Sequence, residues 1–322
     1  MKKVNKPVKV YKGFNKYMQC TPNGEIFQYE IGKEYKEDKA DLCHCGFHAC
    51  ENPLDVLSYY NNIDDKFCEV ELDKIDSNRN RDSKICGKKI KIGIEIGFLG
   101  LFKAGIEWIK NKTIFTKEDF KKLPSSYNAK ISSSDYNARI GSSSDYARIG
   151  SSGNHVQIGS SGYNAQISSS GDDAKIGSSY DYAQIGSSGD NAKIGSSGDG
   201  AKIGSSGYNA KIGSSGNGAR IGSSGNHAQI GSSGCNARIG SFGDYVQIDS
   251  SGDGCVIMCA GINSSAKAKI GSWITLAEWK YSKEKQRHIP FSVVTKQVDG
   301  IEIKEDVYYT LQDGKFKESE QQ

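Results

Sequence analysis

The sequence predicts a mainly β protein: a small α+β N-terminal domain, then a parallel β-solenoid of nine-residue units, then a β-rich C-terminal cap. Two observations predict this class. An Ile recurs every nine residues from Ile131 to Ile257. A Gly-Ser-Ser-Gly stretch, which is typical turn chemistry, follows most of these residues. A three-residue strand with a tight bend buries nothing alone, so the units must stack and share one core.

Each unit carries a small apolar residue, Ala in most units, two positions before its Ile, and a polar residue between them. This in-out-in alternation is the period of a strand with one buried face. Two or three units can form one coil. We favour two, which gives roughly seven coils and a rise of about 35 Å at ~4.8 Å per strand. A Ser recurs in every unit from Ser133 to Ser250, and we expect its hydroxyl to satisfy backbone groups at the bends.

Charge in the repeats is sorted by position. All nine Lys and Arg residues between 125 and 257 occupy the outward strand position, whereas nearly all of the ten acidic residues lie in the bends. A solvated outer face and a docking surface for an acidic partner both agree with this pattern. The candidate binding surface consists of this basic column and three bend tyrosines: Lys130, Arg139, Arg148, Lys175, Lys193, Lys202, Lys211, Arg220, Arg238, Tyr163, Tyr182 and Tyr208.

Other nine-residue or flat solenoids have different signatures. Calcium-binding β-rolls need Gly-Gly-x-Gly-x-Asp, but the bend Asp in this chain changes position and is often Asn, Tyr or His. Ice-binding solenoids present ranks of Thr, and the outward column is Lys, Arg and Gln. Gly-x-x-Gly repeated a dozen times indicates bend geometry, because a phosphate-binding loop occurs once, between a strand and a helix.

The regions that flank the array are predicted from local patterns. Residues 1–75 are expected to form the α+β domain, with strands over 8–14, 27–30 and 67–72 and a helix that Asn52 and Pro53 begin. Residues 76–124 are expected to be a linker and N-terminal solenoid cap, with a strand over 90–96 that starts the stack and helices over 98–109 and 117–123. The solenoid is placed at 125–270, with 268–270 as its last degenerate unit, and the cap at 271–322, with a hairpin of 291–298 and 301–303.

A cluster of Cys and His in the N-terminal domain is a candidate metal site. Its members are Cys20, Cys43, Cys45, His48 and Cys50. Their spacing differs from the paired C-x₂₋₄-C knuckles of structural zinc sites, so we interpret them as reduced, partly buried thiols and expect no metal.

Three motifs in the same region resemble an uncharacterised N-terminal domain of bacteriophage and prophage proteins, in which Gly-Ser-Ser-Gly-type arrays often follow. The motifs are Tyr11-Lys12-Gly13-Phe14, the run 27–33 and Gly46-Phe47-His48-Ala49-Cys50-Glu51-Asn52-Pro53. The resemblance implies a phage origin and carries no activity with it.

A second, looser similarity is to ADP-ribosyltransferases, which bind NAD and polarise its ribose with a Glu. It implies that Lys12, His48 and Glu71 form the catalytic set. Lys12 stands where those enzymes usually have Arg, the sequence His48-Ala49-Cys50 replaces their Ser-Thr-Ser, and Glu71 comes early in the chain.

Composition places few limits on function. The net charge of +4 and a pI near 8.4 do not demand a nucleic-acid partner. No apolar run approaches the ~20 residues of a membrane span. Nine Cys without an export signal favour a cytoplasmic location.

We therefore expect a non-enzymatic, phage-type interaction protein without cofactors. Its solenoid is expected to dock a host protein and to inhibit a defence or housekeeping factor, with nucleic acid as the other candidate partner. The alternatives are an NAD-dependent transferase that uses the solenoid as a targeting arm, and a virion or fibre component. The oligomeric state is left open by the sequence.

Overall fold

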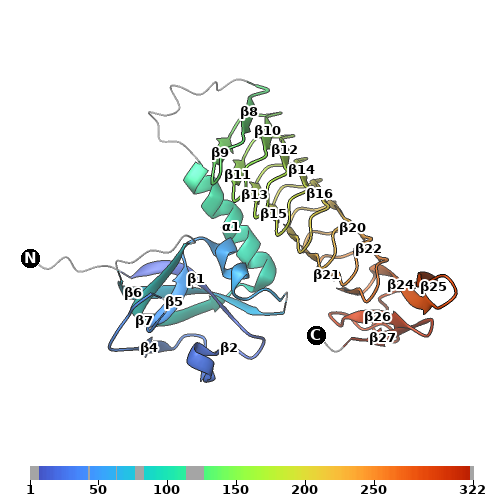
Figure 1. Ribbon diagram of the computed structural model, residues 1–322, viewed down its shortest axis with the longest axis horizontal. Helices are drawn as coiled ribbons and strands as arrows, with labels where there is room; N and C mark the ends of the chain where they lie inside the picture. Colours follow the sequence, from blue (N-terminus) through green and yellow to red (C-terminus); the bar gives the residue numbers. More distant parts are fainter. Residues whose placement is uncertain (1–6, 43, 63, 77–82, 114–126, 320–322) are drawn as a thin grey trace, which may run out of the picture. The chain divides into compact units, whose positions relative to one another are not determined.

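The computed structural model describes residues 7–42, 44–62, 64–76, 83–113 and 127–319. The chain divides into two compact units, Met1–Trp108 and Ile109–Gln322. The first unit is α+β and the second is a β-solenoid with a β-rich C-terminal end (Figure 1). The predicted fold class is therefore confirmed.

The first unit is organised around one antiparallel sheet that closes on itself. Its strand order is β4-β7-β5-β1-β6, and β7 also pairs with β6. The closed sheet surrounds an apolar core that includes Val10, Phe14, Phe47 and Leu72. Its strands are β1 (Val8–Phe14), β4 (Glu34–Lys36), β5 (Phe47–Cys50), β6 (Lys66–Ile75) and β7 (Lys84–Glu95), and a separate pair is formed by β2 (Gln19–Cys20) and β3 (Phe27–Gln28).

The strand predicted over 90–96 does not start the solenoid, because it is the second half of β7. Ile90 and Ile92 are fully buried in the core of the first unit, and the strand pairs with β4 and β6. Alternating Ile residues indicate a strand with a buried face but do not say which core that face joins. The first unit thus extends beyond residue 75, through Trp108.

Besides the short 3₁₀ helix η1 (Pro22–Gly24), two longer helices accompany this sheet in the described residues. The Asn52 side chain accepts a hydrogen bond from the Leu54 amide and begins η2 (Pro53–Ser58), so the predicted cap is confirmed, although the helix is a 3₁₀ helix. Helix α1 (Gly97–Thr113) includes the helix predicted over 98–109. Its Phe98 packs against Phe67 of β6 with the ring centroids 6.3 Å apart, so its apolar side belongs to the first unit. The helix predicted over 117–123 lies outside the described residues.

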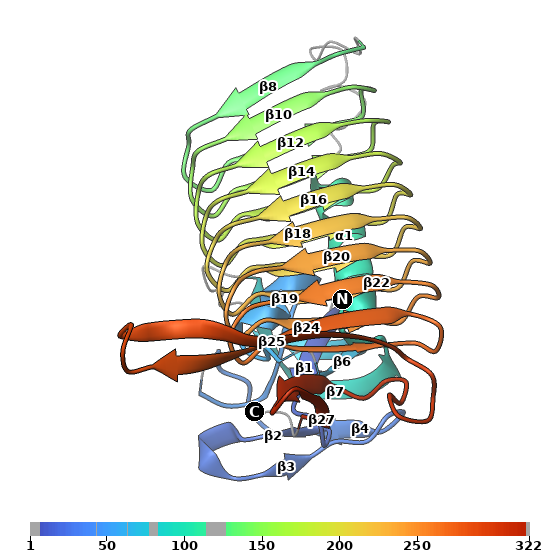
Figure 2. The same cartoon turned by 90° about the vertical axis from the view of Figure 1, so that its right-hand side faces the viewer.

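The solenoid has two nine-residue units per coil, which is the arrangement that we favoured from the sequence. Each strand pairs in parallel with the strand eighteen residues later, for example Ile203 with Ile221 and Ile212 with Ile230. Alternate units therefore build two sheets, and Figure 2 shows the strands of one of them stacked in order. The first sheet contains β8 (Lys130–Ser133), β10 (Arg148–Ser151), β12 (Gln166–Ser169), β14 (Gln184–Ser187), β16 (Lys202–Ser205), β18 (Arg220–Ser223), β20 (Arg238–Ser241) and β22 (Val256–Cys259). The second contains β9 (Arg139–Ser142), β11 (Gln157–Ser160), β13 (Lys175–Ser178), β15 (Lys193–Ser196), β17 (Lys211–Ser214), β19 (Gln229–Ser232), β21 (Gln247–Ser250) and β23 (Ser265–Ala268).

The geometry of the bends explains which residues occupy the repeat positions outside the strands. The residue before each inward Ala has a positive φ, as at Asn191 (55°) and Asn209 (55°), which is why Asn and Gly are frequent there. Bend Asp and Asn side chains accept a hydrogen bond from a backbone amide one coil further on. Asp190 Oδ1, for example, lies 2.8 Å from the Tyr208 amide nitrogen. The acidic residues thus hold neighbouring coils in register.

The prediction that the repeated Ser hydroxyls satisfy backbone groups at the bends is wrong for most coils. Ser133 and Ser142 do accept hydrogen bonds from amides two residues later. From Ser169 to Ser250, however, the corresponding hydroxyls are buried and have no hydrogen-bond partner among the described residues. The Ser points inward beside the Ala and Ile, so its small size suits the narrow interior, while Asp and Asn satisfy the bends.

The C-terminal segment extends both sheets. Its strands are β24 (Trp273–Ser282), β25 (Arg287–Gln297), β26 (Tyr309–Gln312) and β27 (Lys315–Glu318). Strand β24 stacks on β22 and forms a hairpin with β25, whereas β26 joins β23 through Ala266 and Tyr309. These hairpins end the stack with antiparallel strands, as expected of a cap.

Two details of this end differ from prediction. The last degenerate unit keeps the nine-residue period, with Ala266 in the Ile position opposite Ile248, and is not 268–270. Residues 301–303 form no strand, so the predicted hairpin is wrong. Asp299 Oδ1 accepts hydrogen bonds from the amides of all three of these residues and holds them in a turn. Within the described part of the chain, no helix is long and apolar enough to cross a bilayer.

Candidate functional site

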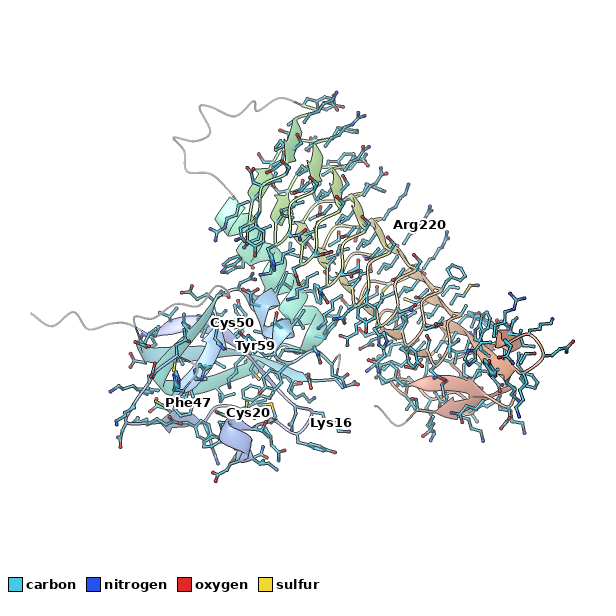
Figure 3. The ribbon with its side chains drawn as sticks, in the orientation of Figure 1. Lys16, Cys20, Phe47, Cys50, Tyr59 and Arg220 are labelled. Atoms are coloured by element: carbon cyan, nitrogen blue, oxygen red, sulfur yellow. The ribbon has the colours of Figure 1, made fainter. Side chains whose placement is uncertain are left out.

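The first sheet presents an exposed polar column along its outer surface. From β8 to β20, the long polar side chain at the first position of each strand points outward and is solvent-exposed, and Figure 3 shows Arg220 extending from the ribbon. We call this set the first-sheet column: Lys130, Arg148, Gln166, Gln184, Lys202, Arg220 and Arg238. In the described part of the chain, no carboxylate lies within 4.0 Å of any of its five cations, so this surface is basic and unneutralised.

Stacking places like charges directly opposite one another. Lys202 pairs in register with Arg220, and Arg220 with Arg238, while Lys130 faces Arg148 at the other end. Neighbouring strands lie ~4.8 Å apart, so each pair repels by at most about 1 kcal/mol in water before screening. The row therefore opposes folding slightly, and an acidic partner would relieve that repulsion.

The corresponding residues of the second sheet are less exposed. Arg139 is exposed and Lys175 is half-buried, whereas Lys193 and Lys211 are almost completely buried. The nine basic residues predicted as one surface thus divide between two sheets. The first sheet offers the longer exposed column.

A strip of Gly and Ser runs beside the first-sheet column and was not singled out from the sequence. It consists of the next outward residue of each strand: Ser132, Gly150, Ser168, Gly186, Gly204, Gly222 and Gly240. A Cβ built at Gly186, Gly204 or Gly222 meets nothing within 4 Å, and these residues have no positive φ. Together with the column, the strip borders a shallow groove of about 870 Å³.

Bend glycines provide an internal comparison. A Cβ built at Gly207 would overlap the carbonyl group of Gly189 in the previous coil, with the carbonyl carbon 2.6 Å away. Contact with the previous coil therefore favours glycine in the bend, and every equivalent position from Gly153 to Gly261 is glycine except Tyr180. At Gly204, in the same unit, neither packing nor backbone conformation requires it.

The tyrosines lie on the two edges of the solenoid. Tyr163 and Tyr182 belong to a ladder with Tyr127 and Tyr146 on one edge, with neighbouring centroids 5.0 to 5.8 Å apart. Tyr208 lies on the other edge, 5.0 Å from His227. Tyr182 has a φ of 58°, which is costly for a bulky residue. The ring contacts between coils help to offset that strain.

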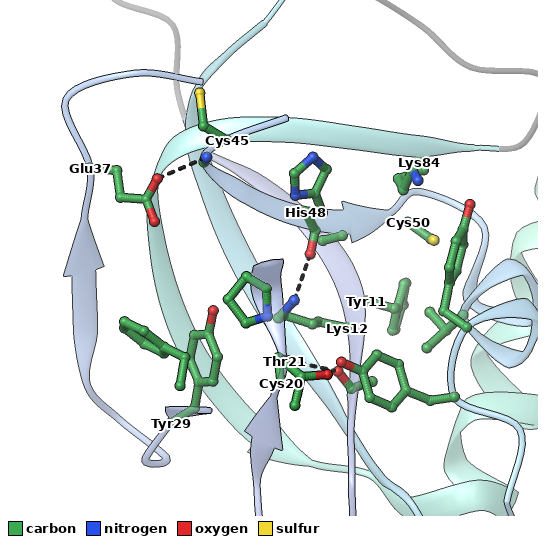
Figure 4. Close-up of a pocket in the computed structure, with 18 of the residues that line it drawn as sticks. Tyr11, Lys12, Cys20, Thr21, Tyr29, Glu37, Cys45, His48, Cys50 and Lys84 are labelled. Atoms are coloured by element: carbon green, nitrogen blue, oxygen red, sulfur yellow. Dashed lines mark hydrogen bonds between the residues drawn. The ribbon is translucent and has the colours of Figure 1, made fainter. Parts of the chain in front are cut away.

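The first unit contains a separate cavity of about 810 Å³. Lys12 of β1 and His48 of β5 both line it, and Lys12 Nζ donates a hydrogen bond to the His48 carbonyl oxygen at 3.0 Å (Figure 4). Burial, followed by the charges of Lys12 and Lys84, lowers the pKa of His48 to about 4, so its imidazole is neutral at pH 7.

Glu71 is not brought into this cavity. It is exposed on β6, opposite Lys9 of β1 and Lys91 of β7 in the strand register, and it does not line the cavity. The residues suggested by the transferase resemblance thus occupy two places. Two carboxylates line the cavity, Glu25 and Glu37, and Glu37 accepts a hydrogen bond from the Gly46 amide at 2.8 Å.

The cysteines of the first unit do not assemble a metal site in the described residues, where no group of three His, Cys, Asp or Glu is placed to hold an ion. Cys20, Cys45 and Cys50 line the cavity. Cys43 lies outside the described residues.

The comparisons with known proteins concern only the first unit. A family described as a domain of unknown function, DUF7666, matches residues 8–104. The match supports an N-terminal domain that includes β7 and the start of α1, in agreement with the first structural unit. No curated protein matches the chain, and no solved structure does.

Proposed function

We propose that this chain is a non-enzymatic interaction protein whose solenoid docks an acidic protein along the first-sheet column. The observation that carries the proposal is the pairing of an unneutralised basic column with a strip of Gly and Ser on the same exposed surface. Complementary charge gives such a surface a fast and selective encounter with an acidic partner.

The glycine strip supports direct contact with the backbone of the first sheet. Glycine in a strand is destabilising by roughly 0.5–1 kcal/mol relative to Ala, because it loses more conformational freedom on folding. Neighbouring positions vary between Lys, Arg and Gln, whereas the strip keeps only Gly and Ser from Ser132 to Gly240. A partner that lies flat on the sheet accounts for this restriction, because larger side chains would hold it away.

The acidic edges favour a protein over nucleic acid. Asp145, Asp181 and Asp199 lie in the bends on one side of the column, and Asp135 and Asp190 lie in those on the other. A protein with a narrow acidic strip can contact the column and avoid these edges. A nucleic acid carries phosphate charge along its whole length and width, so the edges would repel it.

The remaining parts of the proposal rest on sequence resemblance. Motifs such as Tyr11-Lys12-Gly13-Phe14 are similar to those of phage and prophage proteins. We therefore place the partner in the bacterial cytoplasm as a host protein that docking inhibits. The transferase alternative has less support, since Glu71 lies outside the cavity that contains Lys12 and His48.

The test is affinity capture from bacterial lysate with three variants of the full chain. One variant combines Lys202→Glu, Arg220→Glu and Arg238→Glu, and the second is Gly204→Trp, which blocks the strip without changing charge. We expect both to lose a nuclease-resistant protein partner that the wild type retains. The control combines Lys283→Glu, Lys315→Glu and Lys317→Glu, three exposed lysines of the C-terminal segment, and should retain it.

Two results would contradict the proposal. A partner that binds the three-site column variant as well as it binds the wild type would exclude this surface. Capture of nucleic acid alone, abolished by nuclease, would show that the column contacts phosphates. Circular dichroism of each variant should remain that of the wild type, because all substituted positions are exposed.

A further inference from the structure

The cavity of the first unit contains a buried cation that has no carboxylate partner in the described part of the chain. Lys12 is 9% exposed, and its Nζ donates a hydrogen bond to the His48 carbonyl oxygen. Among the described residues, no carboxylate lies within 4.0 Å of this nitrogen. A buried ammonium is costly unless it is paired, and one carbonyl offsets only part of that cost.

Aromatic rings surround the same cation. Lys12 Nζ lies 5.5 Å from the centroids of both Phe14 and Tyr29, within cation–π range. Tyr59 and Tyr60 also line the cavity, and Lys84 Nζ lies 4.6 Å above the Tyr59 ring. Figure 4 shows the Lys12 side chain among the lining residues. Positive charge and flat apolar surfaces therefore occur together.

We infer that this cavity binds a small organic anion that carries a planar ring. The anionic group pairs with the Lys12 ammonium, and the ring packs against the tyrosines. The cavity volume of about 810 Å³ is in the range of small-molecule sites. His48 is neutral, so it can donate or accept a hydrogen bond without adding charge. The anion is a phosphate or a carboxylate, and both complete the pair that Lys12 lacks.

The site is independent of the solenoid docking surface, because every residue that lines it lies between Tyr11 and Lys84. Its residues come from β1, β5 and β7 of the closed sheet, from the β2–β3 pair with the turn at Pro22, and from the η2 region. Failure of the docking proposal would leave this inference standing.

The experiment is calorimetric titration of the full chain with three probes. AMP combines a ring with a phosphate, benzoate combines a ring with a carboxylate, and adenosine is a ring without charge. We expect saturable binding of AMP, benzoate or both, at least tenfold weaker in Lys12→Met. Lys88→Met, at an exposed position of β7 outside the cavity, should bind as the wild type does.

Each result decides the inference. Binding of AMP without benzoate assigns a phosphate ligand, and the reverse assigns a carboxylate. Adenosine binding, where it occurs, should be the same in wild type and Lys12→Met. No saturable binding of either anion up to about 5 mM, a range in which millimolar sites are measured, would overturn the inference, as would equal binding by Lys12→Met.

A ligand-free measurement provides the second criterion. Lys12→Met removes an unpaired buried charge, so its urea midpoint without ligand should equal or exceed that of the wild type. A lower midpoint would mean that Lys12 supports the fold itself, and the anion site would be rejected.

Discussion

Substituting the two glycines of a single repeat tests how the solenoid stacks. Gly204 and Gly207 lie three residues apart, but a Cβ at Gly204 meets nothing within 4 Å, whereas one at Gly207 lies 2.6 Å from the carbonyl carbon of Gly189. Carbon atoms in contact are about 3.5–4.0 Å apart. Gly207→Ala must therefore move two coils apart by about 1 Å.

That movement breaks hydrogen bonds between the same two coils. The Ser206 amide donates to the Ser187 carbonyl oxygen at 3.0 Å, and the Tyr208 amide to Asp190 Oδ1 at 2.8 Å. Losing both, at about 1 kcal/mol each or more where a group stays buried, gives a destabilisation of about 2–4 kcal/mol. Gly204→Ala should be neutral or stabilising by up to about 1 kcal/mol.

The assay is urea unfolding followed by far-UV circular dichroism, with both variants compared with the wild type. We expect a lower midpoint for Gly207→Ala only. Amide exchange should also accelerate around Ser206, since the disturbance is confined to neighbouring coils. Equal midpoints for the two variants would refute the idea that contact between coils favours glycine at position 207.

Further predictions concern the core, the pH response and the thiols. Ser214→Ala should raise the urea midpoint or leave it unchanged, because it removes a buried hydroxyl without a partner among the described residues. A clearly lower midpoint would show that this hydroxyl does form a stabilising hydrogen bond. Ile212→Ala should cost about 2–5 kcal/mol, and Ile212→Val about 1 kcal/mol, by the same unfolding assay. The folded-state pKa of His48, about 4, lies below the ordinary value of 6.5, so its contribution to stability is complete above pH 6.5 and is lost as the pH falls towards 4; His48→Gln should reduce this dependence. Burial raises the pKa of the Cys259 thiol to about 12, so iodoacetamide should label the half-buried Cys235 in the native state and Cys259 only after unfolding.

The sequence by itself was sufficient to predict the solenoid, because the pattern that defines a solenoid unit is local and is repeated along the chain. The nine-residue recurrence of Ile places each Ile inward, and Ala two positions earlier follows from strand alternation. Bend chemistry also follows from single positions, as at Asn209, where a positive φ suits Asn. The same alternation could not assign β7, since buried Ile90 and Ile92 fit either core equally well.

Tertiary structure decided which surfaces and side chains meet. Two units per coil put Lys202 on the exposed first sheet and Lys193 and Lys211 on the second, a division that no single unit contains. Closure of the N-terminal sheet brought Lys12 to the His48 carbonyl across 36 residues of sequence and left Glu71 outside the cavity. The sequence of one repeat determines which of its side chains point into the core. Which other residues those side chains meet depends on chain segments that are far away in sequence.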